Sequence, residues 1–187
     1  MKFKEVETKY DAAEIQLQAF TDLVEPMKPS KWMMVSSYDD YFTRPNGEFI
    51  RYRYTDDRGE LTIKQKTNDK NNNERVEVNL PTKGDNLKTV EKFCTLAGYE
   101  YNFGIYKTCK IAWVDKVVVV WYIVYDKDMK ELRRFIEIEA NEDLEWESEE
   151  AAWNEVVRYE KLFEPLGITP KNRLKKSLFE LFYRENK

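Results

Sequence analysis

The sequence contains no histidine among its 187 residues. The imidazole side chain is therefore excluded both as a general base and as a metal ligand, so any bound metal would have to be a hard cation held by oxygen. Cysteine is scarce as well, with Cys94 and Cys109 only, and the charged start of the chain at Lys2 does not resemble a secretory signal. We expect a reduced, cytoplasmic location.

Long hydrophobic runs are also missing. The most apolar stretch, Val117 to Tyr125, has the length of a strand, whereas a membrane-spanning helix needs about 20 apolar residues. The net charge of −4 and the pI near 5.2 give no electrostatic reason to bind a membrane or duplex nucleic acid. With 42% hydrophobic residues, the chain fits a single folded domain over residues 1–187.

Charged residues instead recur at a spacing of two. The first case is Glu5, Glu7 and Lys9, and the same spacing returns in Arg51/Arg53, Lys64/Lys66, Arg75/Glu77 and Glu137/Glu139. In a β-strand, residues two apart lie on the same face. The intervening positions are mostly apolar. This pattern fits an ordinary sheet with its charged face in water, or a closed barrel with a charged interior and helices outside.

The expected elements mix strands and helices. Apolar spacing and capping signals predict helices at residues 11–24, from Asp85 to Gly98, at Glu149–Phe163, and from Thr169-Pro170 onward. Alternation and turn residues predict strands at Trp32–Ser36, Ser37–Phe42, Glu48–Thr55, Glu60–Lys66, Glu74–Leu80, Phe103–Trp113, Lys116–Tyr125 and Leu132–Ala140.

Together these motifs resemble the CYTH superfamily, also called triphosphate tunnel metalloenzymes. The family's N-terminal Glu-x-Glu-x-Lys stands here as Glu5-Val6-Glu7-Thr8-Lys9. Further matches, in the family's order, are Tyr38-Asp39-Asp40-Tyr41-Phe42, Ile50-Arg51-Tyr52-Arg53, Leu61-Thr62-Ile63-Lys64, Arg75-Val76-Glu77 and Phe135-Ile136-Glu137-Ile138-Glu139. The resemblance implies an α+β fold with an eight-stranded antiparallel β-barrel, closed into a tunnel.

The resemblance also implies a divalent metal-dependent hydrolase of a triphosphate. Its metal, Mg²⁺ or Mn²⁺, would be held by Glu5, Glu7, Glu77, Glu137 and Glu139, since both cations prefer carboxylate oxygen. The phosphates would be bound by Lys9, Arg51, Arg53, Lys64, Lys66, Arg75 and Lys107. Glu7 and Glu77 are the candidates for positioning the attacking water, and Lys9 is the candidate catalytic cation.

One departure from the family pattern concerns Cys109. It stands where the family's Lys-x-Arg strand has arginine after Lys107, and Lys110 cannot replace that arginine because it has the opposite parity. Three functions stay open: a hydrolase of inorganic, thiamine, nucleoside or RNA 5′-triphosphate, an adenylate cyclase, and a nucleotide- or polyphosphate-binding protein without turnover. In each case the expected partner is a molecule that carries a triphosphate.

Overall fold

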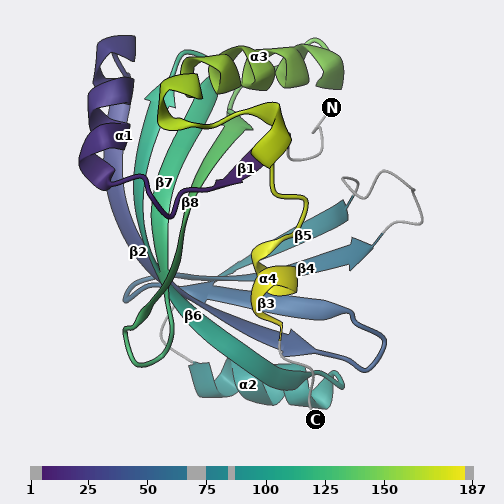
Figure 1. Ribbon diagram of the computed structural model, residues 1–187. Coiled ribbons are helices and arrows are strands. Elements are labelled where there is room, and N and C mark those ends of the chain that lie inside the picture. Colours follow the sequence, from purple (N-terminus) through teal and green to yellow (C-terminus); the bar gives the residue numbers. More distant parts are fainter. Residues whose placement is uncertain (1–5, 67–74, 84–86, 184–187) are drawn as a thin grey trace. The chain divides into compact units, whose positions relative to one another are not determined.

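The structure is a computed structural model that describes residues 6–66, 75–83 and 87–183, and only the backbone of residues 64–66 and 75–77 (Figure 1). Its strands are β1 (Glu7–Asp11), β2 (Lys31–Thr43), β3 (Phe49–Tyr54), β4 (Gly59–Lys66), β5 (Arg75–Thr82), β6 (Glu100–Val114), β7 (Val117–Tyr125) and β8 (Glu131–Ala140). The helices are α1 (Leu17–Val24), α2 (Leu87–Leu96), α3 (Glu149–Leu162) and α4 (Leu178–Phe182), with short 3₁₀ turns at Glu25–Met27, Glu164–Leu166 and Pro170–Asn172. The fold class is α+β, as the sequence predicted.

Three expectations about individual elements are wrong. The first helix begins at Leu17, because Asp11 already belongs to β1, and the two pieces expected within residues 32–42 form one long strand, β2. The helix expected from Thr169 is a single 3₁₀ turn, which Thr169 and Asn172 cap reciprocally. The chain leaves this turn in an extended conformation at Arg173, and α4 starts only after Ser177, whose side chain caps it.

The strands form one eight-stranded antiparallel sheet in the order β1-β8-β7-β6-β2-β3-β4-β5. Within the described residues no pairing joins β5 to β1, so the closure by hydrogen bonds expected of a barrel is wrong. A physical reason lies at β1. Its outer edge is already used: Arg173 forms a β-bridge with Tyr10, and the backbone N–H of Leu174 donates to the carbonyl of Lys9 at 2.7 Å. At Lys9 and Tyr10 the edge of β1 is therefore no longer open to a further strand.

The contacts within the chain group into two compact units, which share the long strands β2 and β6. The first unit comprises Met1–Val35, Thr108–Tyr125 and Glu131–Lys175, and the second comprises Ser36–Lys107, Asp126–Lys130 and Lys176–Lys187.

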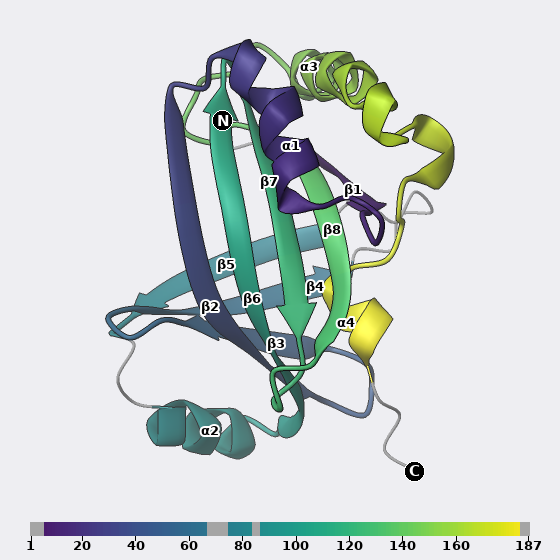
Figure 2. The same ribbon diagram turned by 60° about the vertical axis from the view of Figure 1, so that its left-hand side comes forward.

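In the first unit, α1 and α3 cover the apolar face of β1, β7 and β8 (Figure 2). Phe20 and Val24 of α1 and Val156 of α3 are fully buried there, together with Ile136 and Ile138 of β8. Burying side chains of this size removes a large apolar area from water, which stabilises the fold at about 25 cal/mol per Å². The charged residues of β1 and β8 are thereby directed to the other face.

In the second unit, α2 packs on one face of the sheet through Val90 and Cys94, which contact a core that includes Phe42, Ile50 and Tyr52. On the opposite face, Phe179 of α4 stacks on Phe49, with ring centroids 4.1 Å apart, and contacts Tyr41 and Phe103. Among the described residues, no helix is both long enough and apolar enough to span a membrane.

Candidate functional site

An acidic cluster lies on the charged face of the first unit. The antiparallel register of β1 and β8 places Glu7 opposite Glu139 and Lys9 opposite Glu137. Directly opposed residues share a face, so these four side chains project from the same side of the sheet. Four residues that the sequence assigned to the site are therefore neighbours. Their formal charge is −2, from three carboxylates and one ammonium.

Lys9 and Glu137 form the buried centre of this cluster. The Lys9 ammonium lies 2.9 Å from Glu137 Oε1 and 3.8 Å from Glu7 Oε1, and its side chain is 9% exposed. The Tyr122 hydroxyl of β7 donates to the same Glu137 oxygen at 2.8 Å. Burial and the nearby Glu137 carboxylate raise the pKa of Tyr122 well above its usual value. Tyr122 therefore acts as a neutral hydrogen-bond donor that holds Glu137 in place.

The donor set of this cluster fits a hard divalent cation. Glu7 and Glu139 are directly opposed in the register, and like charges placed in this way repel each other. Carboxylate oxygens are the ligands that Mg²⁺ and Mn²⁺ prefer. In the described part of the chain, no three acidic or thiol side chains already converge on one point as a preformed metal site would.

A basic cluster lies in the second unit, around a carboxylate that is not exposed at all. Asp39 of β2 accepts two hydrogen bonds from Arg53, one from Nε at 2.8 Å and one from Nη2 at 3.0 Å. The ammonium of Lys107 lies 2.8 Å from Asp39 Oδ2. Burial opposes ionisation, but Arg53 and Lys107 outweigh it and hold the pKa of Asp39 well below its usual range. Asp39 therefore fixes the positions of two predicted phosphate-binding cations and offsets part of their charge.

Arg51 extends the same face. Its Nη2 donates to Thr62 Oγ1 at 3.0 Å and lies 3.6 Å from the Glu60 carboxylate. Thr62 in turn donates to Asn79 at 2.7 Å. The guanidinium is thus oriented by β4 and β5, and its side chain is 13% exposed.

The remaining predicted site residues can be placed only in part. The backbone register of β4 and β5 puts Lys64 opposite Glu77 and Lys66 opposite Arg75, but the side chains of these four lie outside the described residues. Glu5 lies wholly outside them. The parts assigned to these five residues stay predictions.

The structure agrees with the parity argument at Cys109. Lys110 lies over the ring of Trp32, 4.6 Å from its centroid, so it is engaged away from the face that carries Lys107 and Cys109. Cys109 is half-buried and is not part of a disulfide.

Two site residues escaped the sequence analysis. Tyr122 stands in a run of apolar residues and gave no signal of its own. Asp39, in contrast, could have been found, because a hairpin centred on Asn46 pairs residue 39 with residue 53, the pairing observed between β2 and β3.

Comparison with known proteins places the fold but no family. No family model matches the chain, and no curated protein matches it. Among solved structures, a conserved hypothetical protein from Pyrococcus furiosus is 24% identical, with a TM-score of 0.73 over 96% of this chain and 100% of that one. A candidate adenylate cyclase from Vibrio parahaemolyticus is 15% identical, with a TM-score of 0.65 over 97% and 98%. Another, from Bacillus halodurans, is 13% identical, with a TM-score of 0.64 over 98% and 100%. At these identities the likeness shows a shared fold, and that fold is one found in candidate adenylate cyclases and in archaeal proteins of unassigned function.

Proposed function

We propose that the protein is a metal-dependent hydrolase of a triphosphate. One observation carries the proposal: Glu7 and Glu139 are directly opposed on one face of the sheet, beside Glu137, with the single ammonium of Lys9 among them. Three carboxylates gathered in this way leave a charge of about −2, which a Mg²⁺ or Mn²⁺ ion would offset.

Each described residue then has a definite part. Glu7, Glu137 and Glu139 would hold the cation, which supplies charge neutralisation for the phosphoryl group when bound. Lys9 and the guanidinium groups of Arg51 and Arg53 would bind phosphate oxygens, and arginine can contact two oxygens at once. Glu7 is the described candidate for orienting the attacking water. Lys64, Lys66, Arg75 and Lys107 complete the proposed phosphate-binding set, and Glu5 and Glu77 the proposed metal ligands.

A purely structural role explains part of this pattern but not all of it. Arg53 and Lys107 form ion pairs with Asp39. These ion pairs alone would explain why the three charges are present. The opposed pair Glu7 and Glu139 adds a mutual repulsion to the fold, which a bound cation would offset. A protein that only captured anions would need the basic cluster and not the acidic one.

Adenylate cyclase is the second candidate. It is favoured by the shared fold with candidate adenylate cyclases from Vibrio parahaemolyticus and Bacillus halodurans. The same metal and phosphate contacts would then serve release of pyrophosphate from ATP. The products distinguish the two reactions, since a hydrolase releases phosphate and a cyclase releases pyrophosphate and cyclic AMP.

The test is incubation of the purified protein with Mg²⁺ or Mn²⁺ and, separately, tripolyphosphate, thiamine triphosphate, ATP and a 5′-triphosphorylated RNA. We expect phosphate release from at least one of them, abolished by EDTA. Glu139→Gln and Glu7→Gln should each lower turnover at least 100-fold, because each removes a metal ligand.

The matched control is Glu131→Gln, in the same strand as Glu139 but paired with Arg134 at the surface. It should keep wild-type turnover. Products of pyrophosphate and cyclic AMP would replace the hydrolase by the cyclase. Wild-type turnover in both Glu7→Gln and Glu139→Gln would overturn the assignment of the acidic cluster.

A further inference from the structure

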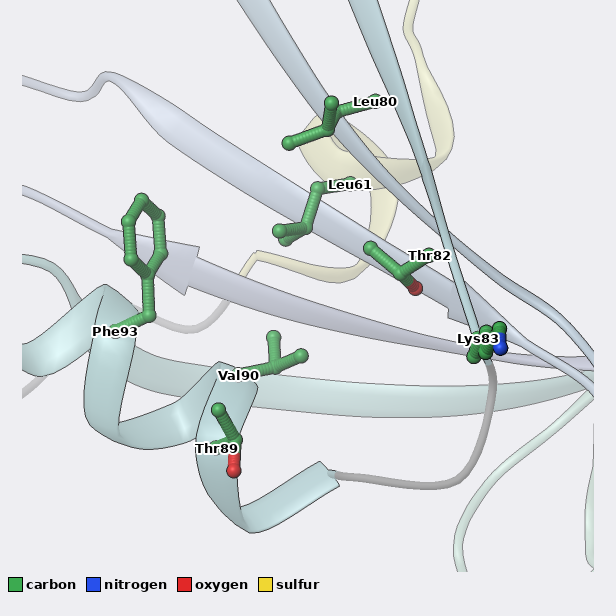
Figure 3. A pocket seen from close by; sticks show the side chains of 7 residues that line it. All are labelled: Leu61, Leu80, Thr82, Lys83, Thr89, Val90 and Phe93. Atoms are coloured by element: carbon green, nitrogen blue, oxygen red, sulfur yellow. The ribbon is translucent and has the colours of Figure 1, made fainter.

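A pocket of about 320 Å³ lies within the second unit, between α2 and the strands β4 and β5 (Figure 3). It is lined by Leu61, Leu80, Thr82, Lys83, Thr89, Val90 and Phe93. Figure 3 shows Phe93 at one end and Thr82 with Lys83 at the other, with Leu61, Leu80 and Val90 between them. The lining is thus mostly apolar, with Thr82 and Lys83 at one end and Thr89 next to Val90.

The pocket belongs to the opposite face of the sheet from the basic cluster. Leu61 lines it, whereas the adjacent Thr62 accepts the hydrogen bond from Arg51. Successive residues of a strand point to opposite faces. None of the residues assigned to triphosphate chemistry lines this pocket.

One group at the polar end lacks a hydrogen-bond partner. The hydroxyl of Thr82, which lines the pocket, and that of Tyr52, which does not, are both buried and have no hydrogen-bond partner in the described structure. Both lie 2.5 Å from the point that a Cβ at Gly59 would occupy, so glycine is what leaves room for them. Buried hydroxyls are nearly always hydrogen-bonded in native proteins. The Thr82 hydroxyl could therefore rotate toward the pocket without breaking a hydrogen bond.

Lys83 supplies the charge at this end. It is exposed and forms no ion pair with any residue that the structure describes. A ligand that matches these features has an apolar body, to contact Leu61, Leu80 and Phe93, and one anionic end, to meet Lys83 and Thr82. Ligand sites of this kind combine a mostly apolar lining with a few placed polar groups, and their usual volume starts near 300 Å³.

We propose that this pocket binds a medium-chain monocarboxylate, with the alkyl chain between α2 and the β4–β5 face and the carboxylate at Lys83 and Thr82. The proposal does not depend on the triphosphatase activity. A second copy of the chain is the rival occupant, because Phe93, Leu80 and Val78 nearby are more than half exposed. The exposed ammonium of Lys83 favours the carboxylate, since an apolar contact between copies would bury it without a partner.

The test is isothermal titration calorimetry of the full chain with hexanoate, octanoate and decanoate. We expect saturable binding of one equivalent, with affinity rising about fourfold for each added methylene until the pocket is filled. Decanol should bind at least tenfold more weakly than decanoate. Lys83→Gln should remove that difference, whereas Lys88→Gln, an exposed lysine of α2 outside the lining, should keep it.

Two further variants guard against misfolding as an explanation. Leu80 is 58% exposed, so Leu80→Glu should fold, and its carboxylate should abolish decanoate binding by repulsion. Leu96→Ala on the outer side of α2, where Leu96 is 80% exposed, should bind as the wild type does. Absence of decanoate binding would overturn the proposal, as would equal binding of decanol and decanoate. A concentration-dependent dimer in sedimentation that Leu80→Glu dissociates, without decanoate binding, would assign the surface to a second copy.

Discussion

At the scale of single residues, Asp39 and Asp40 show how strand parity decides the chemistry of two adjacent carboxyls. Asp39 faces Arg53 and Lys107, which hold its pKa low. Asp40 points to the other face, where burial raises its pKa to about 6, although the Tyr54 hydroxyl donates a hydrogen bond to it. Asp40 packs next to Gly104: a Cβ atom at residue 104 would lie only 2.4 Å from Asp40 Oδ1. Asp39 is therefore ionised at neutral pH, whereas ionisation of Asp40 costs folding free energy.

We therefore predict opposite effects for the two isosteric amides. A raised carboxyl pKa in the folded state means that the folded protein binds more protons, so Asp40 lowers stability as the pH rises from about 4 through 6. Asp40→Asn should raise the free energy of unfolding by about 2 kcal/mol at pH 7.5 and by little at pH 4. Urea unfolding at a series of pH values measures this.

Asp39→Asn is the contrasting variant. Its lowered pKa contributes stability that is present above pH 4 and is lost as the pH falls. The variant leaves Arg53 and Lys107 without their buried anion, so it should lose about 3 kcal/mol at pH 7.5. Two variants with the same sign of effect at pH 7.5 would contradict the assignment of the two faces.

At the scale of elements, the segment after α3 is anchored to β1 through Glu160. This carboxylate is fully buried and accepts hydrogen bonds from the Tyr10 hydroxyl and from both Nε and Nη2 of Arg173. These bonds lower the pKa of Glu160 against the effect of burial, whereas burial, together with the bond to Glu160, raises the pKa of Tyr10 above its usual range. Arg173 is the residue that pairs with the edge of β1.

We predict that Arg173→Ala destabilises the protein by about 3 kcal/mol, because it leaves the Glu160 carboxylate buried with one hydrogen-bond donor. The control is Arg158→Ala, which removes an arginine whose ion pairs with Glu155 and Asp115 are exposed and should cost less than about 1 kcal/mol. Chemical denaturation measures both. Amide hydrogen exchange at Leu174 should accelerate in the first variant alone, and unchanged exchange would count against the anchoring role.

Comparison of the expected strands with the observed ones shows where prediction from the sequence succeeds. Alternation located all the strands from Phe49 onward and separated the charged face from the apolar one, because strand parity is a local property. The pairing of Arg173 with Tyr10 joins segments more than 160 residues apart, and local periodicity carries no information on it. The expected closure of the barrel was wrong for that reason. Within the site, the pairing of Asp39 with Arg53 and Lys107 required the register.

At the scale of the whole molecule, the proposed function predicts that stability depends on ligand. A ligand that binds only the folded state stabilises it by about 2.7 kcal/mol at 100 times its Kd. For a chain of this length that corresponds to a rise in Tm of about 5–10 °C. If the proposed function holds, Mg²⁺ with a triphosphate should produce this rise. The cation would offset the negative charge of the acidic cluster, and the triphosphate would offset the positive charge of the basic cluster.

We predict that tripolyphosphate or a non-hydrolysable ATP analogue, added with 5 mM Mg²⁺ as a working concentration chosen to be about saturating, raises the Tm in differential scanning calorimetry and that EDTA reverses most of the rise. Glu139→Gln should lose the part that requires Mg²⁺, because it removes one carboxylate of the opposed pair and with it the need for a divalent cation. Decanoate should still raise the Tm of Glu139→Gln, since Glu139 does not line the pocket proposed for decanoate. An equal rise in wild type and Glu139→Gln with Mg²⁺ and triphosphate would show that the acidic cluster takes no part in binding.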